Sequence, residues 1–413
     1  MKLDEVAVLY IITKLELGGA QKVCLSLLNG VNKSGIKAGL ISGADGSMAS
    51  RVKKSEYIYL LDSIKREVGF RFIISEIKAF FQIIKIIKKI KKIHPSLIVH
   101  THSTKAGIIG RWAAFFSGVK KRIHTVHGFG FNDYQSKVKW FFIFSIEYLT
   151  SLITTHFICV SEKDREFGVR KFPKFGQKSS IIRAAVEWDK FYTPALKKHE
   201  VSLEQNISFQ CDSNQNESYH DKSCPDKSCR DKSFVIGTIS CFKPQKNLFD
   251  LLNAFKILHS KLSEENKKIV RLQIIGDGVL RYQIEEWISK NNLSEKIDLL
   301  GWQNNVEVWM RGWKVFAMSS LWEGLPIAVV EARLCKLPVV TYDVGGIFEV
   351  IFNGQNGFLV SPKNFDKLSD CLRLLIENKE LWQKMSDFND EISDFSDHVM
   401  IDKHVQLYQK ILQ

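Results

Sequence analysis

Short apolar runs alternate with helical patterns along nearly the whole chain, and this alternation constrains the fold more than any other feature. It is typical of parallel sheets whose strands are connected through helices. In the first half, strands are predicted at Val6–Ile12, Leu97–His100, Arg122–Val126 and Phe157–Val160. In the second half, they are predicted at Val235–Ile239, Leu272–Ile275, Val315–Met318, Pro338–Thr341 and Phe358–Val360. Helices are expected between them, for example at Leu248–Ser260 and Pro326–Cys335. The chain is therefore predicted to be an α/β protein.

A polar stretch over 196–233 divides the chain into two predicted domains, 1–195 and 234–394. With 413 residues, the chain is too long for one core of ordinary size. The stretch repeats Asp-Lys-Ser three times, starting at Asp221, Asp226 and Asp231. A segment as polar as this one cannot bury enough apolar surface to offset the entropy that it would lose on ordering. We therefore expect a flexible insertion. The segment also contains four residues of types that can bind zinc, at Cys211, His220, Cys224 and Cys229. They lack the paired Cys-x-x-Cys spacing of familiar zinc sites, so the low complexity of the segment is the better explanation for their presence.

Neither a secretory signal nor a transmembrane segment is expected. Asp4 and Glu5 occupy the region that is positively charged in a signal peptide. The apolar run that follows them is too short for the hydrophobic core of such a peptide. The longest apolar stretch, Trp140 to Phe157, contains Glu147 and several hydroxyl residues. A buried helix is therefore predicted there rather than a bilayer span. Without a leader, the eight cysteines are expected to stay reduced in the cytosol.

The net charge of +14 is concentrated in the first half of the chain. Residues 1–195 hold 32 Lys and Arg against 15 Asp and Glu, whereas the remainder holds 27 against 30. A one-sided positive charge favours an anionic partner. A nucleic acid is not expected, because no helix-turn-helix, zinc-finger or aromatic strand motif accompanies the charge. The basic segment 72–93 leaves two interpretations open: a core-packed helix with a solvated lysine face, or a peripheral contact with an anionic membrane.

The most informative segment runs from Ser319 to Ala332, with the sequence Ser-Ser-Leu-Trp-Glu-Gly-Leu-Pro-Ile-Ala-Val-Val-Glu-Ala. It follows a predicted strand and continues into a predicted helix, whose first turn suits Pro326. The backbone amides at such a helix start form an anion site that fits a diphosphate. Glu323 precedes the helix and Glu331 lies on it, eight residues further along.

This segment resembles the Glu-x7-Glu signature of glycosyltransferase family 4. The family has the GT-B fold, in which two Rossmann-like domains face each other across a cleft and a C-terminal helix crosses back to the N-terminal domain. The resemblance extends over nearly the whole chain. It includes the Gly-Gly loop at 17–21, the loops at 100–107 and 125–130, the turns at 276–278 and 300–302, the loop at 344–349, and a closing helix at 395–413.

The resemblance implies a set of functional residues. Glu323 and His127 would lie at the reacting centre, and Glu331 would hold the ribose of the donor. Further donor-binding residues would be Gly18, Gly19, Lys243, Lys246, Gly324, Leu325 and Pro326, and the acceptor side would include His102 and Lys105. Glycine at 18 and 19 would let the backbone approach a sugar phosphate closely. No cofactor and no metal are expected, and the chain has no Asp-x-Asp triplet.

One position departs from the family pattern. An arginine that grips the donor diphosphate is usual five or six residues before the lysine, and here Cys241 stands five residues before Lys246. A thiol cannot replace a bidentate guanidinium, although Lys243 is a nearby cation. The alternative is therefore a degenerate relative that binds donor or membrane without efficient turnover. A sugar-nucleotide 2-epimerase shares the fold but would not need the Gly-Gly loop together with Glu-x7-Glu.

The expected activity follows from the resemblance. The chain would transfer a sugar from a nucleoside-diphosphate sugar, with UDP as the expected nucleotide, to a glycan or a polyprenyl-diphosphate-linked acceptor. The family retains the anomeric configuration. With the basic first half, this implies a cytoplasmic protein, peripheral on the inner face of the plasma membrane, that acts in cell-surface polysaccharide synthesis.

Overall fold

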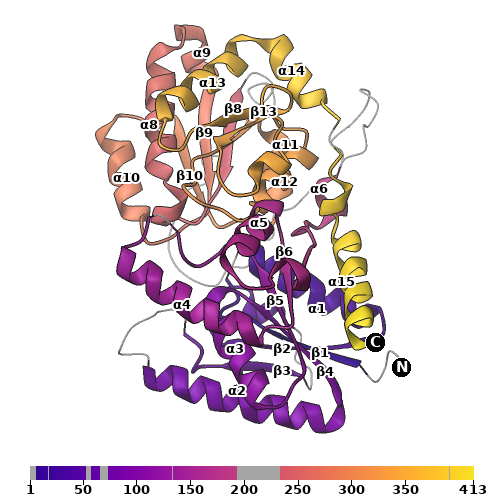
Figure 1. Cartoon of the computed structure of the whole chain (residues 1–413). Coiled ribbons are helices and arrows are strands. Elements are labelled where there is room, and N and C mark those ends of the chain that lie inside the picture. The colour runs from indigo at the N-terminus through magenta and orange to yellow at the C-terminus, as the bar shows by residue number, and fades with distance from the viewer. Residues whose placement is uncertain are drawn as a thin grey trace.

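Two α/β units lie one above the other in the computed structural model of the chain (Figure 1). The structure describes residues 6–16, 18–52, 57–65, 73–132, 134–192, 233–389 and 391–413. Apart from Ser233, the predicted insertion over 196–233 and its potential zinc ligands lie outside these ranges. The exact domain boundaries therefore stay a prediction.

The N-terminal unit contains a seven-stranded parallel sheet in the order β3-β2-β1-β4-β5-β6-β7. Its strands are β1 (Val6–Ile11), β2 (Lys37–Gly43), β3 (Ile58–Leu61), β4 (Ser96–His102), β5 (Lys121–Val126), β6 (His156–Cys159) and β7 (Ser179–Ile181). Its helices are α1 (Gly19–Lys33), α2 (Ile73–Ile93), α3 (Thr104–Phe116), α4 (Lys137–Ile153), α5 (Glu162–Lys171) and α6 (Trp188–Phe191). Alternate residues of β1 belong to different clusters of the core, Leu9 with α2 and α3, and Tyr10 with α1. Both faces of the sheet are therefore covered.

The C-terminal unit repeats this plan with six parallel strands in the order β10-β9-β8-β11-β12-β13. Its strands are β8 (Phe234–Ile239), β9 (Val270–Ile275), β10 (Ile297–Gly301), β11 (Val315–Met318), β12 (Val339–Tyr342) and β13 (Gly357–Val360). Its helices are α8 (Leu248–Lys261), α9 (Glu264–Ile269), α10 (Arg281–Lys290), α11 (Val306–Gly312), α12 (Ile327–Leu334), α13 (Phe365–Glu377) and α14 (Lys379–Asp387), with short 3₁₀ turns η5 (Pro244–Lys246) and η6 (Ile347–Glu349). In both sheets the first strand lies between the second and the fourth, which is the Rossmann-like arrangement. The predicted fold class is confirmed.

The last helix, α15 (Asp397–Leu412), returns to the N-terminal unit and lies along α1 (Figure 1). Gly30 of α1 makes room for Ile401 of α15. The hydroxyl groups of Tyr10 and Tyr408 are 3.0 Å apart, so the helix contributes to the buried interior of a unit that begins almost 400 residues earlier. A closing helix was predicted at this place.

The helix predicted over Trp140 to Phe157 is present as far as Ile153, but its predicted burial is wrong. Helix α4 ends at Ile153, and the residues from His156 onward form β6. The outer side of α4 is exposed: Phe141 and Phe142 keep 67% and 63% of their surface accessible. Glu147 is instead buried and pairs with Arg111 of α3 at 2.9 Å. Among the described residues, no helix is both long and apolar enough to cross a membrane.

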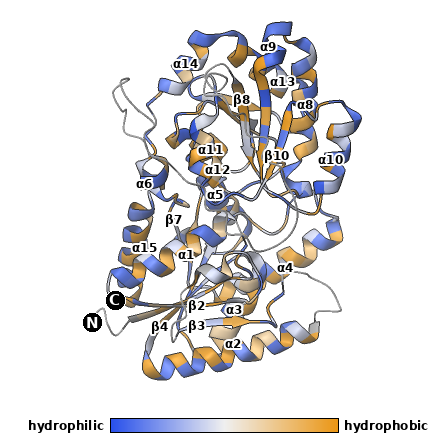
Figure 2. Ribbon diagram, turned by 180° about the vertical axis from the view of Figure 1, so that it is seen from behind, coloured by the Kyte–Doolittle hydropathy of each residue, from blue (hydrophilic) through white to orange (hydrophobic). Residues whose placement is uncertain are grey.

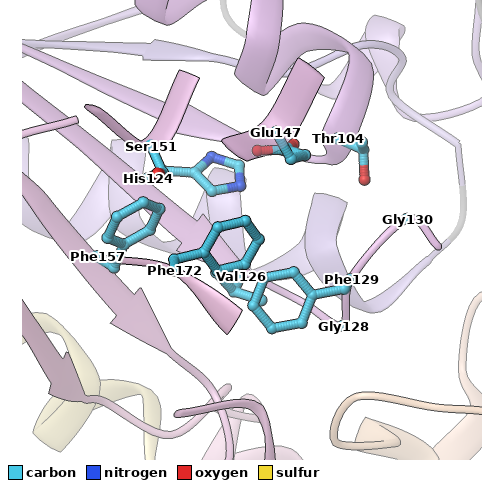
Figure 3. Close-up of a pocket in the computed structure, with 10 residues that line it drawn as sticks. All are labelled: Thr104, His124, Val126, Gly128, Phe129, Gly130, Glu147, Ser151, Phe157 and Phe172. Atoms are coloured by element: carbon cyan, nitrogen blue, oxygen red, sulfur yellow. The ribbon is translucent and has the colours of Figure 1, made fainter. Parts of the chain in front are cut away.

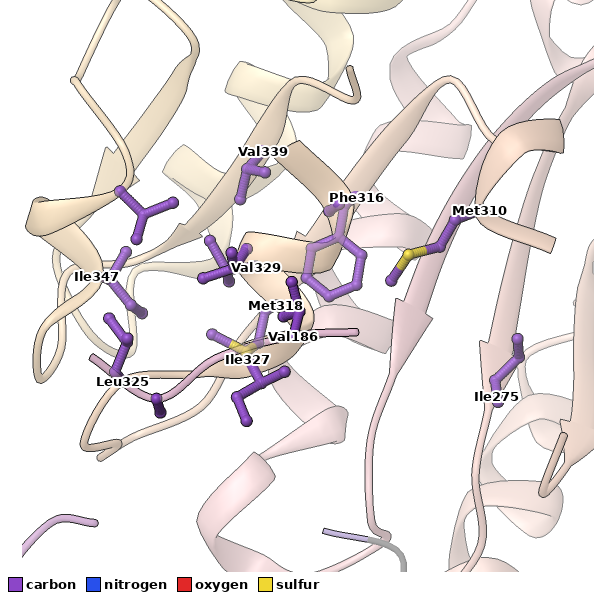
Figure 4. Packing of buried hydrophobic residues seen from close by; sticks show 14 of the residues in the cluster. Val186, Ile275, Met310, Phe316, Met318, Leu325, Ile327, Val329, Val339 and Ile347 are labelled. Carbon is purple, nitrogen blue, oxygen red and sulfur yellow. The ribbon is translucent and has the colours of Figure 1, made fainter. Parts of the chain in front are cut away.

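The start of α12 rests on a closely packed apolar cluster (Figure 4). Leu325 and Ile327 lie beside Ile347 of η6 and Met318 of β11, all of them buried. Val186, which follows β7 of the N-terminal unit, belongs to the same cluster. Because interiors are close-packed, this cluster fixes the direction in which the backbone approaches the helix.

Candidate active site

The topology brings the ends of four strands to the space between the two units. In an open parallel sheet, ligands bind at the carboxyl ends of the strands, where the strand order reverses. That point lies between β1 and β4 in the N-terminal unit and between β8 and β11 in the C-terminal unit. The loops that follow β1, β8 and β11 contain Gly18, Lys246 and Glu323, and His102 is the last residue of β4. The sheet order alone therefore predicts a site where these loops meet.

The loops of the two units touch backbone to backbone. A Cβ atom at Gly324 would lie 2.8 Å from the amide nitrogen of Gly128, and one at Gly128 would lie 3.3 Å from the nitrogen of Gly324. Gly128 has φ +91°, which favours glycine as well. A side chain at Gly345 would collide with the carbonyl of Glu323, and the amide of Gly346 donates to the carbonyl of Gly324 at 2.6 Å. The glycines at these positions therefore permit the close contact of three loops.

Gly19 also faces the other unit. Its Cβ would lie 3.2 Å from Cδ1 of Ile327 at the start of α12, so even alanine would press on that helix. Gly18 differs, because its φ of −157° is extended backbone that any residue adopts. A Cβ there would meet the side chain of Gln21. Only Gly19 of the pair is thus required by its surroundings across the cleft.

Lys246 and Glu323 form an ion pair. Nζ of Lys246 lies 2.5 Å from Oε1 of Glu323, and both side chains are mostly buried. Their loops are joined by two hydrogen bonds from Gln245, whose carbonyl accepts from the amide of Leu321 at 2.9 Å and whose Nε2 donates to the carbonyl of Trp322 at 2.7 Å. An ammonium group has three N–H donors, and the bond to Glu323 occupies one of them.

Glu331 is paired across the cleft with Lys22 of α1. The distance from Nζ to Oε1 is 2.7 Å, and the side chain of Glu331 is only 3% exposed. Burial alone would lower the pKa of Lys22, but the charge of Glu331 and their hydrogen bond outweigh it and raise this pKa above its usual value. Lys22 therefore stays charged, and its contact with Glu331 links the two units.

Lys243 points towards the N-terminal unit, with its Nζ 3.7 Å from Oε2 of Glu16. Cys241 is half-buried in the same loop, and its carbonyl accepts from the amide of Lys243 at 2.8 Å. The predicted role of Lys243 at a diphosphate stays a prediction.

The predicted anion site at the start of α12 has the expected local form. Pro326 is the residue before the first helical residue, Ile327, and its carbonyl accepts from the amide of Val329 at 3.0 Å. Gly324, Leu325 and Pro326 are buried beneath the loop of His127 and Gly128. The partial positive charge at this helix start therefore lies beneath that loop, and its use as an anion site stays a prediction.

His127 lies at the end of β5 and is hydrogen-bonded to His102. Its Nε2 is 3.0 Å from Nδ1 of His102. His127 keeps part of its surface exposed, yet the atoms packed around the ring lower its pKa to about 4. His102 is completely buried, and burial holds its pKa well below the usual value. Both rings are therefore uncharged at neutral pH, and His102 lies behind His127 rather than in the cleft.

The two rings belong to a larger buried cluster. The ring of His100 makes two hydrogen bonds. Its Nδ1 lies 2.7 Å from the hydroxyl of Tyr408, and its Nε2 lies 2.7 Å from the hydroxyl of Thr125. His404 of α15 stacks on His100 with ring centroids 5.7 Å apart, and burial lowers its pKa to about 4. The closing helix thus reaches the histidines behind the cleft.

Lys105, in the first turn of α3, lies 2.7 Å from Oε1 of Glu76 on α2. This contact joins two helices of the N-terminal unit, and its predicted role on the acceptor side stays a prediction. Among the described residues, no group of three or more His, Cys, Asp or Glu is placed to hold a metal ion.

A small pocket opens beside the loop that follows His127 (Figure 3). Phe129, Phe157 and Phe172 form its apolar side, and His124, Thr104 and Glu147 form its polar side. The carboxylate of Glu147 in this lining is already paired with Arg111 of α3.

Three contacts between the units illustrate what sequence reasoning missed. Lys22 is the first; it is the only basic residue in the first turn of α1 behind the Gly-Gly loop, which was a usable signal. Arg183 is the second: it pairs with Glu349 of η6, which also accepts from the amide of Glu162 at 2.9 Å. The third is the stacking of Tyr134 on Trp322 at 5.0 Å. No local pattern indicates the last two.

Comparison with known families agrees with this geometry. The family model described as Glycosyltransferase Family 4 matches residues 17–187, and the model described as Glycosyl transferases group 1 matches residues 222–391. Together the two models span both units and their facing loops. The chain is a GT-B glycosyltransferase of the family 4 type. It is therefore an enzyme of the glycosyltransferase class, and the predicted family is confirmed.

Two curated relatives match most of this family 4 chain. One is the UDP-Gal:alpha-D-GlcNAc-diphosphoundecaprenol alpha-1,3-galactosyltransferase of Escherichia coli, 28% identical over 88% of the chain and 86% of the relative. The other is the capsular polysaccharide biosynthesis glycosyltransferase CapM of Staphylococcus aureus, 26% identical over 77% and 75%. HepE of Anabaena, solved with UDP and glucose, superposes with a TM-score of 0.73 at 15% identity, covering 98% and 99% of the two chains. At that identity, the structural likeness shows the GT-B fold alone.

Proposed function

We propose that the protein transfers a sugar from a UDP-sugar to a glycan acceptor, above all a polyprenyl-diphosphate-linked one, with retention of anomeric configuration. The reaction would serve the synthesis of a cell-surface polysaccharide or glycoconjugate. One observation carries the proposal: the Lys246–Glu323 pair precedes the start of α12 opposite the loop of His127, and Glu331 on α12 meets Lys22 of the other unit. The substrates named for the Escherichia coli relative support the choice of donor and acceptor.

The chemistry needs positive charge where the leaving diphosphate becomes more negative. In the proposal, the ammonium of Lys246 and the amides at the start of α12 supply it. Glu331 would accept from the ribose hydroxyls, and Glu323 would lie against the donor sugar. His127 would present an uncharged ring to the sugar hydroxyls, because its pKa of about 4 keeps it neutral. The donor requires no metal or other cofactor in this scheme.

The protein would be cytoplasmic and peripheral on the inner face of the plasma membrane. Helix α2 packs on the sheet through Ala79, Ile83, Ile87 and Ile90, and Lys85, Lys88, Lys89 and Lys92 are exposed on it. This packing agrees with the interpretation of α2 as a core-packed helix with a solvated lysine face. The same lysines would attract anionic lipid, so a membrane contact is proposed in addition.

A panel of UDP-, GDP- and ADP-sugars tests the donor by thermal shift, followed by transfer assays with a polyprenyl-diphosphate-linked sugar. We expect stabilisation by UDP-sugars, and a loss of transfer of about 10²-fold or more in Glu323→Ala. Glu286→Ala is the matched control, because Glu286 pairs with Lys290 on the exposed side of α10. Proton NMR of the product would check retention.

Two outcomes would contradict the proposal: transfer at the full rate by Glu323→Ala, or no stabilisation by any UDP-sugar. Donor binding by the wild type without transfer to any acceptor would instead identify the degenerate alternative that Cys241 raises. An inverted anomeric centre in the product would contradict retention alone.

A further inference from the structure

Helix α4 turns its polar side inwards and its apolar side outwards. The buried residues of α4 are polar, Glu147, Thr150 and Ser151, and Thr154 just after the helix is buried as well. The outward side carries Val138 (82% exposed), Phe141 (67%), Phe142 (63%), Leu149 (56%) and Leu152 (57%). Surface helices of soluble proteins have the opposite arrangement, with charged residues facing water. The outward face of α4 is thus an apolar stripe that follows the helical period.

The rotation of α4 is fixed by hydrogen bonds from α3. The guanidinium of Arg111 lies 2.9 Å from Oε2 of Glu147 and donates to Oγ1 of Thr154 at 3.0 Å. Nε1 of Trp112 donates to Oγ1 of Thr150 at 3.0 Å. Turning the apolar stripe inwards would leave the fully buried Arg111 without its partner, which is strongly unfavourable. The stripe therefore faces outwards because the fold requires it.

Further exposed apolar residues lie on the neighbouring helices α2 and α3. Phe116 of α3 is 60% exposed and Phe81 of α2 is 63% exposed. Their rings are linked through Phe80, with centroids 6.1 Å from Phe116 and 5.6 Å from Phe81. Figure 2 shows hydrophobic residues along both α4 and α2 on the outside of the N-terminal unit. Single exposed apolar residues are ordinary, but a group of this kind indicates an interaction surface.

The charge on these helices favours an anionic partner. Helices α2, α3 and α4 carry six, two and two Lys and Arg residues, whereas their only carboxylates are Glu76 and Glu147. Both carboxylates are neutralised, Glu76 by Lys105 and Glu147 by Arg111. Lys137 and Lys139 are exposed at the first turn of α4, beside the apolar stripe. Apolar residues among lysines suit the headgroup region of an anionic bilayer.

We propose that the outward face of α4, with Phe116 and Phe81 beside it, inserts into the surface of an anionic lipid bilayer. The inner side of α4 supports the loop after His127: Phe131 packs on Trp140 and Phe144, with centroids 5.4 and 5.5 Å apart. Gln135, just before the helix, donates to the carbonyl of Gly130 at 3.0 Å. Insertion therefore holds the mouth of the cleft at the membrane. Its use for a lipid-linked acceptor rests on the proposed function, whereas the insertion does not.

Vesicle flotation of the full chain tests the proposal. The probes are vesicles of phosphatidylcholine alone and of an equimolar mixture of phosphatidylcholine and phosphatidylglycerol. We expect binding to the mixed vesicles, and a drop of at least about tenfold in the partition coefficient for Phe141→Ser and for Phe142→Ser. Tyr282→Ser is the matched control, because Tyr282 is 74% exposed on α10 of the other unit, and its binding should equal that of the wild type.

Circular dichroism and UDP stabilisation measured on the same variants separate insertion from folding and from donor binding. Variants that keep their fold and still bind UDP but leave the vesicles support the proposal. Unchanged flotation of both phenylalanine variants overturns it. Dimerisation of the wild type through this face also overturns the proposal, and it would be recognised by a Phe141→Ser variant that is monomeric. Vesicle binding without any response to UDP-sugars would contradict the proposed function and leave the insertion standing.

Discussion

Acidification is expected to destabilise the N-terminal unit through its buried histidines, and His404 allows the effect to be measured at one residue. His404 is 1% exposed on α15 and stacks on His100. Its Nδ1 lies 2.7 Å from the carbonyl oxygen of Met400, so the neutral ring donates there. Burial opposes protonation and lowers the pKa of His404 to about 4, against the partial opposition of that hydrogen bond.

The direction and size of the effect follow from proton linkage. A histidine of the unfolded chain titrates near about 6.5, so below that pH the unfolded chain binds a proton that the folded protein does not. Stability is therefore present above the unfolded pKa and is lost as the pH falls towards the folded pKa. Between about pH 7.5 and about pH 5.5, His404 alone should lower the free energy of unfolding by about 1.3 kcal/mol. Burial shifts the pKa values of His100, His102 and His124 in the same direction, so the loss for the whole protein should be larger.

Urea unfolding followed by circular dichroism at the two pH values measures this loss. The variant His404→Leu replaces the ring by an apolar side chain of similar length that cannot be protonated. In this variant the loss of unfolding free energy between the two pH values should be smaller by about 1.3 kcal/mol. The control is His398→Gln on the same helix, where the side chain is 68% exposed and the loss should not change. An equal loss in His404→Leu and the wild type would refute the reasoning, because it would mean that His404 titrates alike in the folded and unfolded chains.

Two further substitutions test the contacts of the cleft. Lys22→Met would leave the buried carboxylate of Glu331 without its cation and should cost about 3–5 kcal/mol of stability, measured by thermal unfolding. The double variant Lys22→Met with Glu331→Gln should regain part of the lost stability. If the stability changes of the two single variants simply add in the double variant, the two side chains do not interact. Cys241→Arg should lower the KM for the donor if the guanidinium reaches the diphosphate, since such a contact is worth about 2–5 kcal/mol in a desolvated site. An unchanged KM would mean that the loop directs this position away from the donor.

Strands could be predicted where the sequence contains a continuous apolar run, whereas β2, which is buried but interrupted by Gly39 and Ser42, was missed. Val315–Met318 agrees with β11 to the residue, because a short apolar run between polar turns has few alternatives. Strand β7 was not predicted, since Ser179–Ile181 has no apolar run and depends on its pairing with β6. Strand β10 was not predicted either, although a turn at a strand end was predicted at 300–302, where Gly301 ends β10 with φ +64° and shifts the register with β9.

The motif residues of the site could be located from the sequence, but their partners could not. Glu331 and Lys22 are 309 positions apart, and their contact depends on how the two units pack. Helix α4 could have been interpreted correctly. Glu147 and the hydroxyl residues at 150, 151 and 154 recur at helical spacing, which indicates one polar face, whereas overall apolarity suggested burial on all sides.

Helix α15 has a consequence for the order in which the protein can fold during synthesis. The hydroxyl of Tyr408 bonds to both Tyr10 and His100, and the backbone at Ser396 pairs with Val186. These partners leave the ribosome long before Tyr408 has been translated. The N-terminal unit is thus synthesised first but completes its fold last. Until the C-terminal unit has been translated and α15 follows it, the surface of α1 that α15 covers stays exposed.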